Sequence, residues 1–366
     1  MKFTIEKQPL FDALTKAARI AERRSTLPIL SYVLLSVEGE ILTVTATDLE
    51  SGIRLSVPCE SERCGQVCAP GKTILQAVSN LSDGPVSLSL DDNLRLSIQA
   101  GDASMSLACL SVDEYPAWTE DDEDTAWVTT SAGGLASALE RVAFAASSDE
   151  SRYGMNCVHF EREDMCTVIV ATDGHRLAFD AIALDFGENF KADVPKKSIV
   201  ELKKLLDEHT GDVKLGVNSK NLILKTEAIT ATARLASTDY PDFRKVIPTE
   251  PGYSFVVKRD SCVTTIKRVA FLLSERNKGM NFSITGQELT LSATHPDLGT
   301  ARDRVAVEYD GEPIEAIING AYLLEALNAF TAEKVRFSQV REGGPFILKV
   351  EGDEGRYFNL VMPMRR

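Results

Sequence analysis

The segment of the chain with the most reactive side chains is Ala171-Thr172-Asp173-Gly174-His175-Arg176-Leu177-Ala178-Phe179. A carboxylate two residues from an imidazole could act as an acid–base pair, and the chain would then be a hydrolase that uses Asp173 and His175. Residues so close in sequence rarely orient one another, however, and no nucleophile motif stands nearby. We therefore expect His175 to be a packed or hydrogen-bonding side chain. The chain is predicted not to be an enzyme, and the hydrolase is kept as a remote alternative.

The seven cysteines could bind a metal or form disulfides. Cys59, Cys64 and Cys68 resemble half of a zinc site, but no fourth Cys or His stands at a matching distance. An odd number of dispersed cysteines is typical of reduced thiols. The start of the chain, residues 1–6, lacks the apolar stretch of a signal peptide, and no apolar run approaches membrane-spanning length. We expect no metal, no cofactor, no membrane contact and a cytoplasmic location.

The Thr172-Asp173 segment recurs in shortened form on either side. Ala46-Thr47-Asp48-Leu49 precedes it and Ala293-Thr294-His295-Pro296-Asp297 follows it, so the threonines at 47, 172 and 294 are 125 and 122 residues apart. A chain of 366 residues suits two or three domains. We therefore predict three tandem domains, at residues 1–125, 126–250 and 251–366.

Each domain is predicted to contain two strand–helix–strand units, which makes the fold α+β. In the first helix, Leu10, Leu14, Ala17 and Ala21 form an apolar face, and mostly cationic residues repeat the same spacing on the opposite face. The same reading predicts strands at 32–37, 41–47 and 52–57, a helix at 72–81, and strands at 86–90, 94–99 and 104–109. The last helix is expected at 321–330.

The net charge of −14 argues against binding to nucleic acid, because affinity for phosphate comes largely from cations. The cations are not evenly spread, however. They lie on the outer faces of most predicted helices, while the acidic run 120–124 is typical of a solvated linker. Six such helices could direct their cationic faces to one place in a ring with helices inside and sheets outside.

The chain resembles the bacterial DNA polymerase III beta subunits, the sliding clamps, over its full length. The resemblance rests on six segments in order: 1–4, 26–30, 47–50, 171–177, 240–244 and 361–365. It implies a head-to-tail homodimer that closes into a ring around double-stranded DNA and reads no sequence. It also implies tethering of the DNA polymerase III alpha subunit, the clamp loader, and other polymerases and repair proteins with clamp-binding peptides, which raises processivity.

The resemblance also implies two sets of site residues. Partner peptides would insert apolar anchors into a pocket formed by Met155, Thr172, Gly174, His175, Arg176, Leu177, Pro241, Val246, Leu360, Val361, Met362, Pro363, Met364 and Arg365. DNA would be contacted by Arg24, Arg152 and Tyr153. The helix faces add Lys16, Arg19, Arg23, Lys72, Arg141, Lys197, Lys204 and Arg268 to the expected DNA contacts.

Two positions depart from the family pattern. Lys245 stands where a second arginine is frequent, and Met155 stands where leucine is common. Both keep the chemical class, so they affect peptide preference and not the existence of the pocket. A paralogous clamp-like scaffold that serves repair or antibiotic tolerance is the main alternative function.

Overall fold

The fold is known from a computed structural model that describes residues 1–21, 27–118, 124–149, 151–152, 154–237, 239–248, 252–274, 277–341, 343–350 and 356–365. Its contacts divide the chain into two compact units. Unit 1 contains Met1–Gly133 and Lys197–Leu235, and unit 2 contains Gly134–Lys196 and Ala236–Arg366. Arg23, Arg24, Tyr153 and most of the acidic run lie outside the described residues. The predicted domain boundaries stay predictions.

Unit 1 has two antiparallel sheets. The smaller has the order β5-β1-β7-β8-β9 among the described residues. Its strands are β1 (Lys2–Glu6), β5 (Glu60–Arg63), β7 (Pro85–Leu90), β8 (Arg95–Ala100) and β9 (Ala103–Ala108). The larger has the order β10-β15-β16-β17-β4-β3-β2-β6. Its strands are β2 (Tyr32–Glu38), β3 (Ile41–Thr47), β4 (Ser51–Pro58), β6 (Gly65–Pro70), β10 (Ala126–Ser131), β15 (Asp212–Val217), β16 (Asn221–Lys225) and β17 (Ile229–Arg234).

The helices of unit 1 bury the faces that their periodicity predicts. Helix α1 (Lys7–Ile20) buries Leu10, Leu14 and Ala17, but it ends one residue before Ala21, whose N–H caps it by donating to the Ala17 carbonyl. Helix α2 (Gly71–Ser79) packs against α1, and α4 (Lys196–Asp207) continues unit 1 from Lys197. A short 3₁₀ helix, η1 (Pro28–Ser31), precedes β2.

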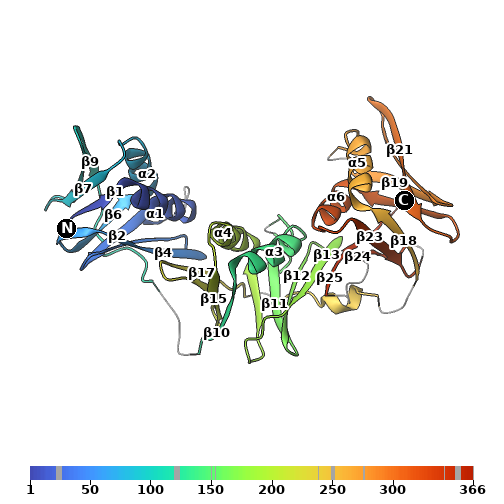
Figure 1. The fold of residues 1–366 in the computed structure, drawn as a ribbon, viewed down its shortest axis with the longest axis horizontal. Coiled ribbons are helices and arrows are strands. Elements are labelled where there is room, and N and C mark those ends of the chain that lie inside the picture. Colours follow the sequence, from blue (N-terminus) through green and yellow to red (C-terminus); the bar gives the residue numbers. More distant parts are fainter. Residues whose placement is uncertain are drawn as a thin grey trace. The chain divides into compact units, whose positions relative to one another are not determined.

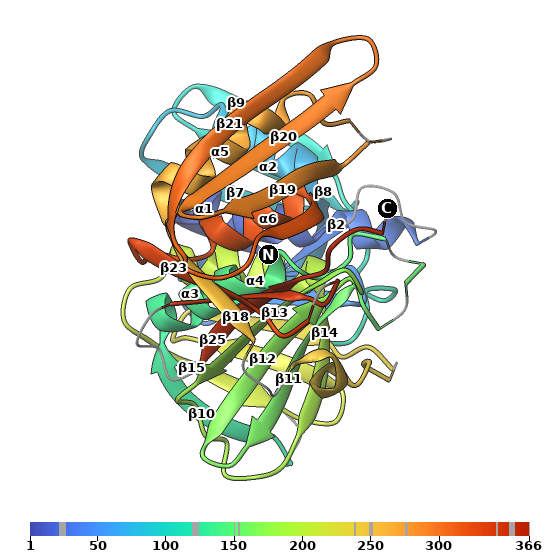
Figure 2. The same ribbon diagram turned by 90° about the vertical axis from the view of Figure 1, so that its right-hand side faces the viewer.

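Unit 2 is built on one long antiparallel sheet, ordered β14-β11-β12-β13-β25-β24-β23-β18-β21-β20-β19-β22 in the described part of the chain. Strands β11, β12, β13 and β25 run side by side in Figure 2. The bounds are β11 (Cys157–Glu163), β12 (Cys166–Thr172), β13 (Arg176–Ile182), β14 (Lys191–Pro195), β18 (Tyr253–Lys258), β19 (Gly279–Thr285), β20 (Glu288–His295), β21 (Gly299–Glu308), β22 (Ile314–Asn319), β23 (Lys334–Gln339), β24 (Phe346–Val350) and β25 (Tyr357–Val361).

The described part of unit 2 also contains three helices and a 3₁₀ helix. They are α3 (Ala132–Ala143), η2 (Phe243–Val246), α5 (Arg259–Ala270) and α6 (Gly320–Asn328). Helices α5 and α6 pack against each other (Figure 1), over a core in which Phe255 stacks on Phe337 at 4.9 Å. The Asn319 side chain caps α6 by accepting hydrogen bonds from the N–H groups of Ala321 and Tyr322.

The element order repeats one unit of strand, helix and three strands: β1-α1-β2-β3-β4, β6-α2-β7-β8-β9, and so on to β22-α6-β23-β24-β25. The predicted α+β repeat is therefore confirmed, and the strands predicted in residues 32–109 begin and end within one residue of those observed. The sequence analysis missed β5. That strand is largely exposed and charged, so it lacks the alternation that marks a half-buried strand, and only its pairing with β1 defines it.

All seven cysteines lie in the described residues as free thiols, and Cys64 alone among them is classed as exposed. Burial raises the pKa of Cys68 and Cys262 to about 12 and that of Cys109 to about 11. Within the described ranges, no group of three or more His, Cys, Asp or Glu side chains is placed to hold a metal ion. None of the described helices is long and apolar enough to cross a membrane.

Candidate functional site

The Thr172–Arg176 segment forms a tight turn between β12 and β13. The Thr172 hydroxyl donates to the Arg176 carbonyl at 2.6 Å and accepts the Gly174 N–H at 3.1 Å. Oδ1 of Asp173 accepts the N–H groups of His175 and Arg176. Gly174 has φ +85°, a conformation that favours glycine. Threonine and aspartate therefore close the turn, and glycine adopts the positive φ of its third position without strain.

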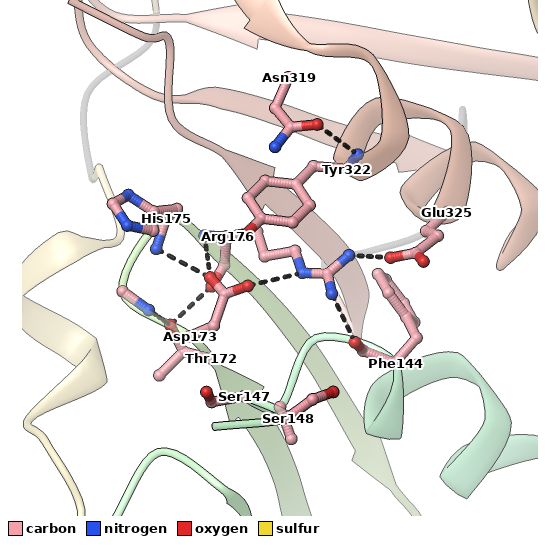
Figure 3. A network of polar contacts seen from close by, with 12 residues as sticks. Phe144, Ser147, Ser148, Thr172, Asp173, His175, Arg176, Asn319, Tyr322 and Glu325 are labelled. Carbon is pink, nitrogen blue, oxygen red and sulfur yellow. Dashed lines mark hydrogen bonds and ion pairs between the residues drawn. The ribbon is translucent and has the colours of Figure 1, made fainter. Parts of the chain in front are cut away.

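The guanidinium of Arg176 is buried and links three elements (Figure 3). Its Nε donates to Asp173 Oδ2 at 3.1 Å and its Nη2 to the Phe144 carbonyl at 2.8 Å, while Nη1 pairs with Glu325 on α6. The same group lies 4.2 Å from the centre of the Tyr322 ring, within cation–π range. Arg176 was predicted to line the pocket, and the structure shows that its side chain is largely buried and held by these three groups.

His175 and Asp173 do not form an acid–base pair. Both Asp173 oxygens are used, one by backbone N–H groups of the turn and the other by Arg176. Figure 3 shows the His175 backbone, not its imidazole, directed at the carboxylate. The arrangement gives Asp173 a structural role and gives no support to the hydrolase alternative.

The end of the chain joins this turn by backbone pairing. Leu360 on β25 lies opposite Leu177 on β13, and both are buried. Beyond β25 the Met362 N–H donates to the His175 carbonyl at 2.9 Å. The Met364 N–H donates to the Ile317 carbonyl at 2.7 Å, so the tail runs from the turn to β22. Pairing alone therefore brings residues 172–177 together with residues 360–364.

An apolar cluster connects this tail to the segment before the third domain. Leu177, Leu360 and Phe243 are buried in it, and Tyr240, Ile247 and Met362 pack against it. Pro241 and Val246 lie on either side of Phe243 in the sequence, in the segment that this cluster ties to the tail. Met155 joins from another loop, with its sulfur 3.6 Å from where a Cβ on Gly174 would lie.

We use the name Met362 surface for seven solvent-accessible members of the predicted pocket set. Val246 is 50% exposed and Met364 41%, which is high for large apolar side chains. Thr172, Arg176, Leu177, Leu360 and Val361 are buried and support the surface, while His175 and Arg365 are exposed beside it. The Met362 surface consists of Met155, Gly174, Pro241, Val246, Met362, Pro363 and Met364.

The sequence analysis missed the groups that fix residues 240–246. Tyr240 stacks on the buried His159 at 4.7 Å, and His159 Nδ1 lies 2.6 Å from Asp193 Oδ1. Arg244 donates to Glu161 at 2.9 Å and to Glu163 at 2.8 Å. Burial alone would raise the pKa of Glu161, but hydrogen bonds from Lys191 and Arg244 outweigh it and lower that pKa. The alternation of His159, Glu161 and Glu163 along one strand was the available signal.

The residues expected to contact DNA are mostly ion-paired within the chain. Lys16 and Arg19 share Glu208, at 3.0 and 2.8 Å. Lys72 is exposed on α2. The positions 23, 24 and 153 lie outside the described residues. The other pairs are Arg141 with Asp180, Arg152 with Asp149, Lys197 with Asp48, Lys204 with Glu201, and Arg268 with Asp303.

In the described residues the strand–helix–three-strand unit occurs six times, which is the architecture of the DNA-clamp class. Family models for the N-terminal, central and C-terminal domains of the DNA polymerase III beta subunit match residues 1–119, 130–242 and 244–365. The chain belongs to the DNA polymerase III beta subunit family.

Relatives and solved structures match the chain over its whole length. The beta sliding clamp of Caulobacter vibrioides is 31% identical and that of Vibrio cholerae 30%, each with 100% of both chains covered. The sliding clamp of Pseudomonas aeruginosa solved with a ligand superposes with a TM-score of 0.94 at 29% identity, again over 100% of both chains. A P. aeruginosa clamp bound to griselimycin gives a TM-score of 0.93 at 29% identity over 100% of both chains.

Proposed function

We propose that this chain is the subunit of a DNA sliding clamp. Two copies would close head to tail into a ring around duplex DNA in the cytoplasm, with domains at residues 1–125, 126–250 and 251–366. The ring would tether the replicative polymerase, and other proteins that carry clamp-binding peptides, without any catalysis of its own. Membership of the beta subunit family over the full length of the chain is the observation that carries this proposal.

Strand addition supports the head-to-tail dimer. Within unit 1, β17 pairs with β4, and within unit 2, β25 pairs with β13, so the last strand of one domain extends the sheet of the domain before it. Continuing the series, β21 of the third domain would receive β9 of the first domain of a second copy. Both strands have mostly exposed side chains, and Phe271 and Leu298 near β21 are large exposed apolar residues. In the described residues β9 is the last strand of its sheet, and β21 pairs with β20 along most of its length but with β18 only through Val307 and Glu308. The remaining edge of each strand is a template on which another chain can pair.

The Met362 surface supports the binding of partner peptides. It combines three methionines with Val246 and two prolines, on a rigid frame of paired strands. Methionine side chains adapt to differently shaped apolar partners, which suits a surface that serves several proteins. A polymerase held there would rebind the primer end intramolecularly, so processivity would rise without a tighter polymerase active site.

The test is retention on circular and linearised nicked plasmid after incubation with a clamp loader and ATP at moderate salt. A sliding clamp stays on the circle and runs off when the DNA is cut. Equal retention on both DNAs, falling steeply with salt, would identify an ordinary electrostatic binder and contradict the ring. No retention on either DNA, with a loader that loads another clamp, would favour a scaffold that does not act on DNA.

A further inference from the structure

In unit 1, the carboxylate of Glu208 forms ion pairs with two of the cations that are expected to contact DNA. Lys16 and Arg19 lie one turn apart on α1, and Glu208 follows directly after α4. Glu208 Oε2 lies 3.0 Å from Lys16 Nζ, and Oε1 accepts a hydrogen bond from Arg19 Nη1 at 2.8 Å. Each oxygen thus serves one cation, as two oxygens of a phosphate would.

Lys16 and Arg19 stabilise the ionised form of the Glu208 carboxylate. Burial alone would raise the pKa of Glu208, but the hydrogen bonds from Arg19 and Lys16 outweigh it and lower that pKa. At neutral pH the three groups therefore carry a net charge of one positive, although the sequence places two positive charges on this face. None of the three is buried: the side chains are 20%, 32% and 38% exposed for Lys16, Arg19 and Glu208.

We propose that Glu208 competes with DNA phosphate for Lys16 and Arg19, and so limits how strongly the ring holds the duplex through this face. The inference rests on the proposed function, because it assumes that α1 faces DNA. Ion pairs at this level of exposure are weak, so an arriving phosphodiester can displace the carboxylate and leave again. A ring that must slide benefits from contacts that exchange rapidly, since strong phosphate contacts would act as friction.

The salt dependence of DNA binding measures this competition. Each phosphate neutralised by a protein cation adds about 0.9 to the slope of log affinity against log salt. A cation already neutralised by Glu208 releases fewer counterions and adds less. The variant Glu208→Gln keeps the shape of the side chain and removes its charge, so it should steepen the slope by about 0.9 for each cation it frees.

The experiment uses the full-length protein and a fluorescent linear duplex of random sequence, with affinity measured between 50 and 200 mM salt. We expect Glu208→Gln to bind at least threefold more tightly than the unmodified protein at 50 mM and to show the steeper slope. Tracking of loaded rings on nicked circles should show slower diffusion of the variant. An unchanged slope overturns the proposal.

Two controls separate competition from other effects. Asp83→Asn removes an exposed carboxylate paired with Lys7, which is outside the expected DNA set, so it tests net charge alone. An equal slope change in Asp83→Asn would overturn the proposal. In a Lys16→Gln/Arg19→Gln background, Glu208→Gln should have no effect on the slope, because its two partners are gone. A residual effect there would show that Glu208 acts on DNA by another route, which also contradicts the proposal.

A purely structural role for Glu208 gives a different result. Such a role, in which the carboxylate only ties α1 to the end of α4, predicts a lower melting temperature for Glu208→Gln with an unchanged slope. Failure of the proposed function is distinguished by the plasmid test on the unmodified protein. Retention on the circle, combined with identical slopes for Glu208→Gln and the unmodified protein, rejects only this inference.

Discussion

In unit 1, β17 pairs with β4 after the Thr47 turn, and in unit 2, β25 pairs with β13 after the Thr172 turn. We call these the two strand junctions. Their backbone hydrogen bonds are alike, but their side chains differ. In unit 1 the Arg234 N–H donates to the Glu50 carbonyl, as the Met362 N–H donates to the His175 carbonyl in unit 2. The Thr47 hydroxyl likewise closes its turn on the Ser51 carbonyl, as Thr172 does on the Arg176 carbonyl. Repetition has therefore preserved the hydrogen bonds that form the junction.

The side chains behind the two turns are different. In unit 1 the Ser51 hydroxyl meets the Ser198 hydroxyl of α4 at 2.8 Å, and Asp48 pairs with Lys197 at 2.6 Å. At the position of Ser51, unit 2 has Arg176 between Phe144, Tyr322 and Glu325. At the position of Arg234 it has Met362. The comparison teaches that the same paired strands carry polar side chains in the first case and the apolar Met362 surface in the second.

The largest difference should appear when the central side chain of each junction is removed. Arg176→Met removes the guanidinium that donates to the buried Asp173 carboxylate and to the Phe144 carbonyl. This loss should cost about 3 kcal/mol of stability in unit 2. Ser51→Ala loses one hydroxyl pair and should cost about 1 kcal/mol in unit 1. Hydrogen exchange of the β13–β25 and β4–β17 amides measures each loss locally. Equal losses of stability in the two variants would mean that Arg176 contributes no more to its junction than Ser51 does.

The next effect concerns binding at the same backbone position. Met362→Glu places a charge on the apolar surface and should weaken a clamp-binding peptide by at least about tenfold, about 1.4 kcal/mol. Arg234→Glu at the matching position of unit 1 should leave peptide affinity unchanged. Fluorescence anisotropy with a labelled peptide gives both values. If Arg234→Glu weakened peptide binding, the peptide would bind at the junction of unit 1, and the prediction would be contradicted.

A smaller effect comes from the turns themselves. Leu49 has φ +73° where unit 2 has Gly174 at φ +85°. Leu49→Gly relieves a conformation that costs an L-residue about 1 kcal/mol and should be neutral or slightly stabilising, because glycine also loses more entropy on folding. Gly174→Ala should cost about 1 kcal/mol, since the new Cβ would meet only an ordinary contact with Met155. Thermal unfolding of both variants tests the asymmetry, and a clear loss in Leu49→Gly would contradict it.

The smallest effect is acid sensitivity. The pKa values of Glu208 in unit 1 and Glu161 in unit 2 are lowered by their cationic partners. A lowered folded-state pKa stabilises the protein above the unfolded value of about 4.3, and that stability is lost as pH falls through the folded pKa. Glu161 is the better buried of the two, so Glu161→Gln should cost up to about 1 kcal/mol at pH 7 and Glu208→Gln less. The melting temperature of each variant is compared with that of the unmodified protein at pH 7 and near pH 3.5. The difference should be smaller at the lower pH.

The sequence was sufficient for the parts of the fold that depend on local pattern and repetition. The spacing of the Thr-Asp segments predicted a threefold repeat, and the spacing of Leu10, Leu14 and Ala17 predicted the buried face of α1. The resemblance to a known family then supplied the residues of the expected peptide pocket. These signals lie within a few turns of the chain or in direct motif matches.

The contacts that determine the role of each site residue could not be predicted, because their partners are distant in sequence. Arg176 was expected in the pocket, and its burial and its bonds to Phe144 and Glu325 could not be read from the sequence. Lys16 and Arg19 were expected to contact DNA, and nothing in the sequence indicated that Glu208, which is 189 residues from Arg19, pairs with both of them. A helix-face pattern gives the direction of a side chain and not the charge that it meets there.

The distribution of the thiols has a practical consequence for observing this protein. Cys64 is exposed in the turn between β5 and β6, whereas the pKa values of Cys68, Cys109, Cys166 and Cys262 are raised by burial, which keeps these thiols protonated. Alkylation requires the thiolate, so a maleimide dye at neutral pH should react first with Cys64. The chain thus carries its own site for attaching a fluorophore, without engineered cysteines.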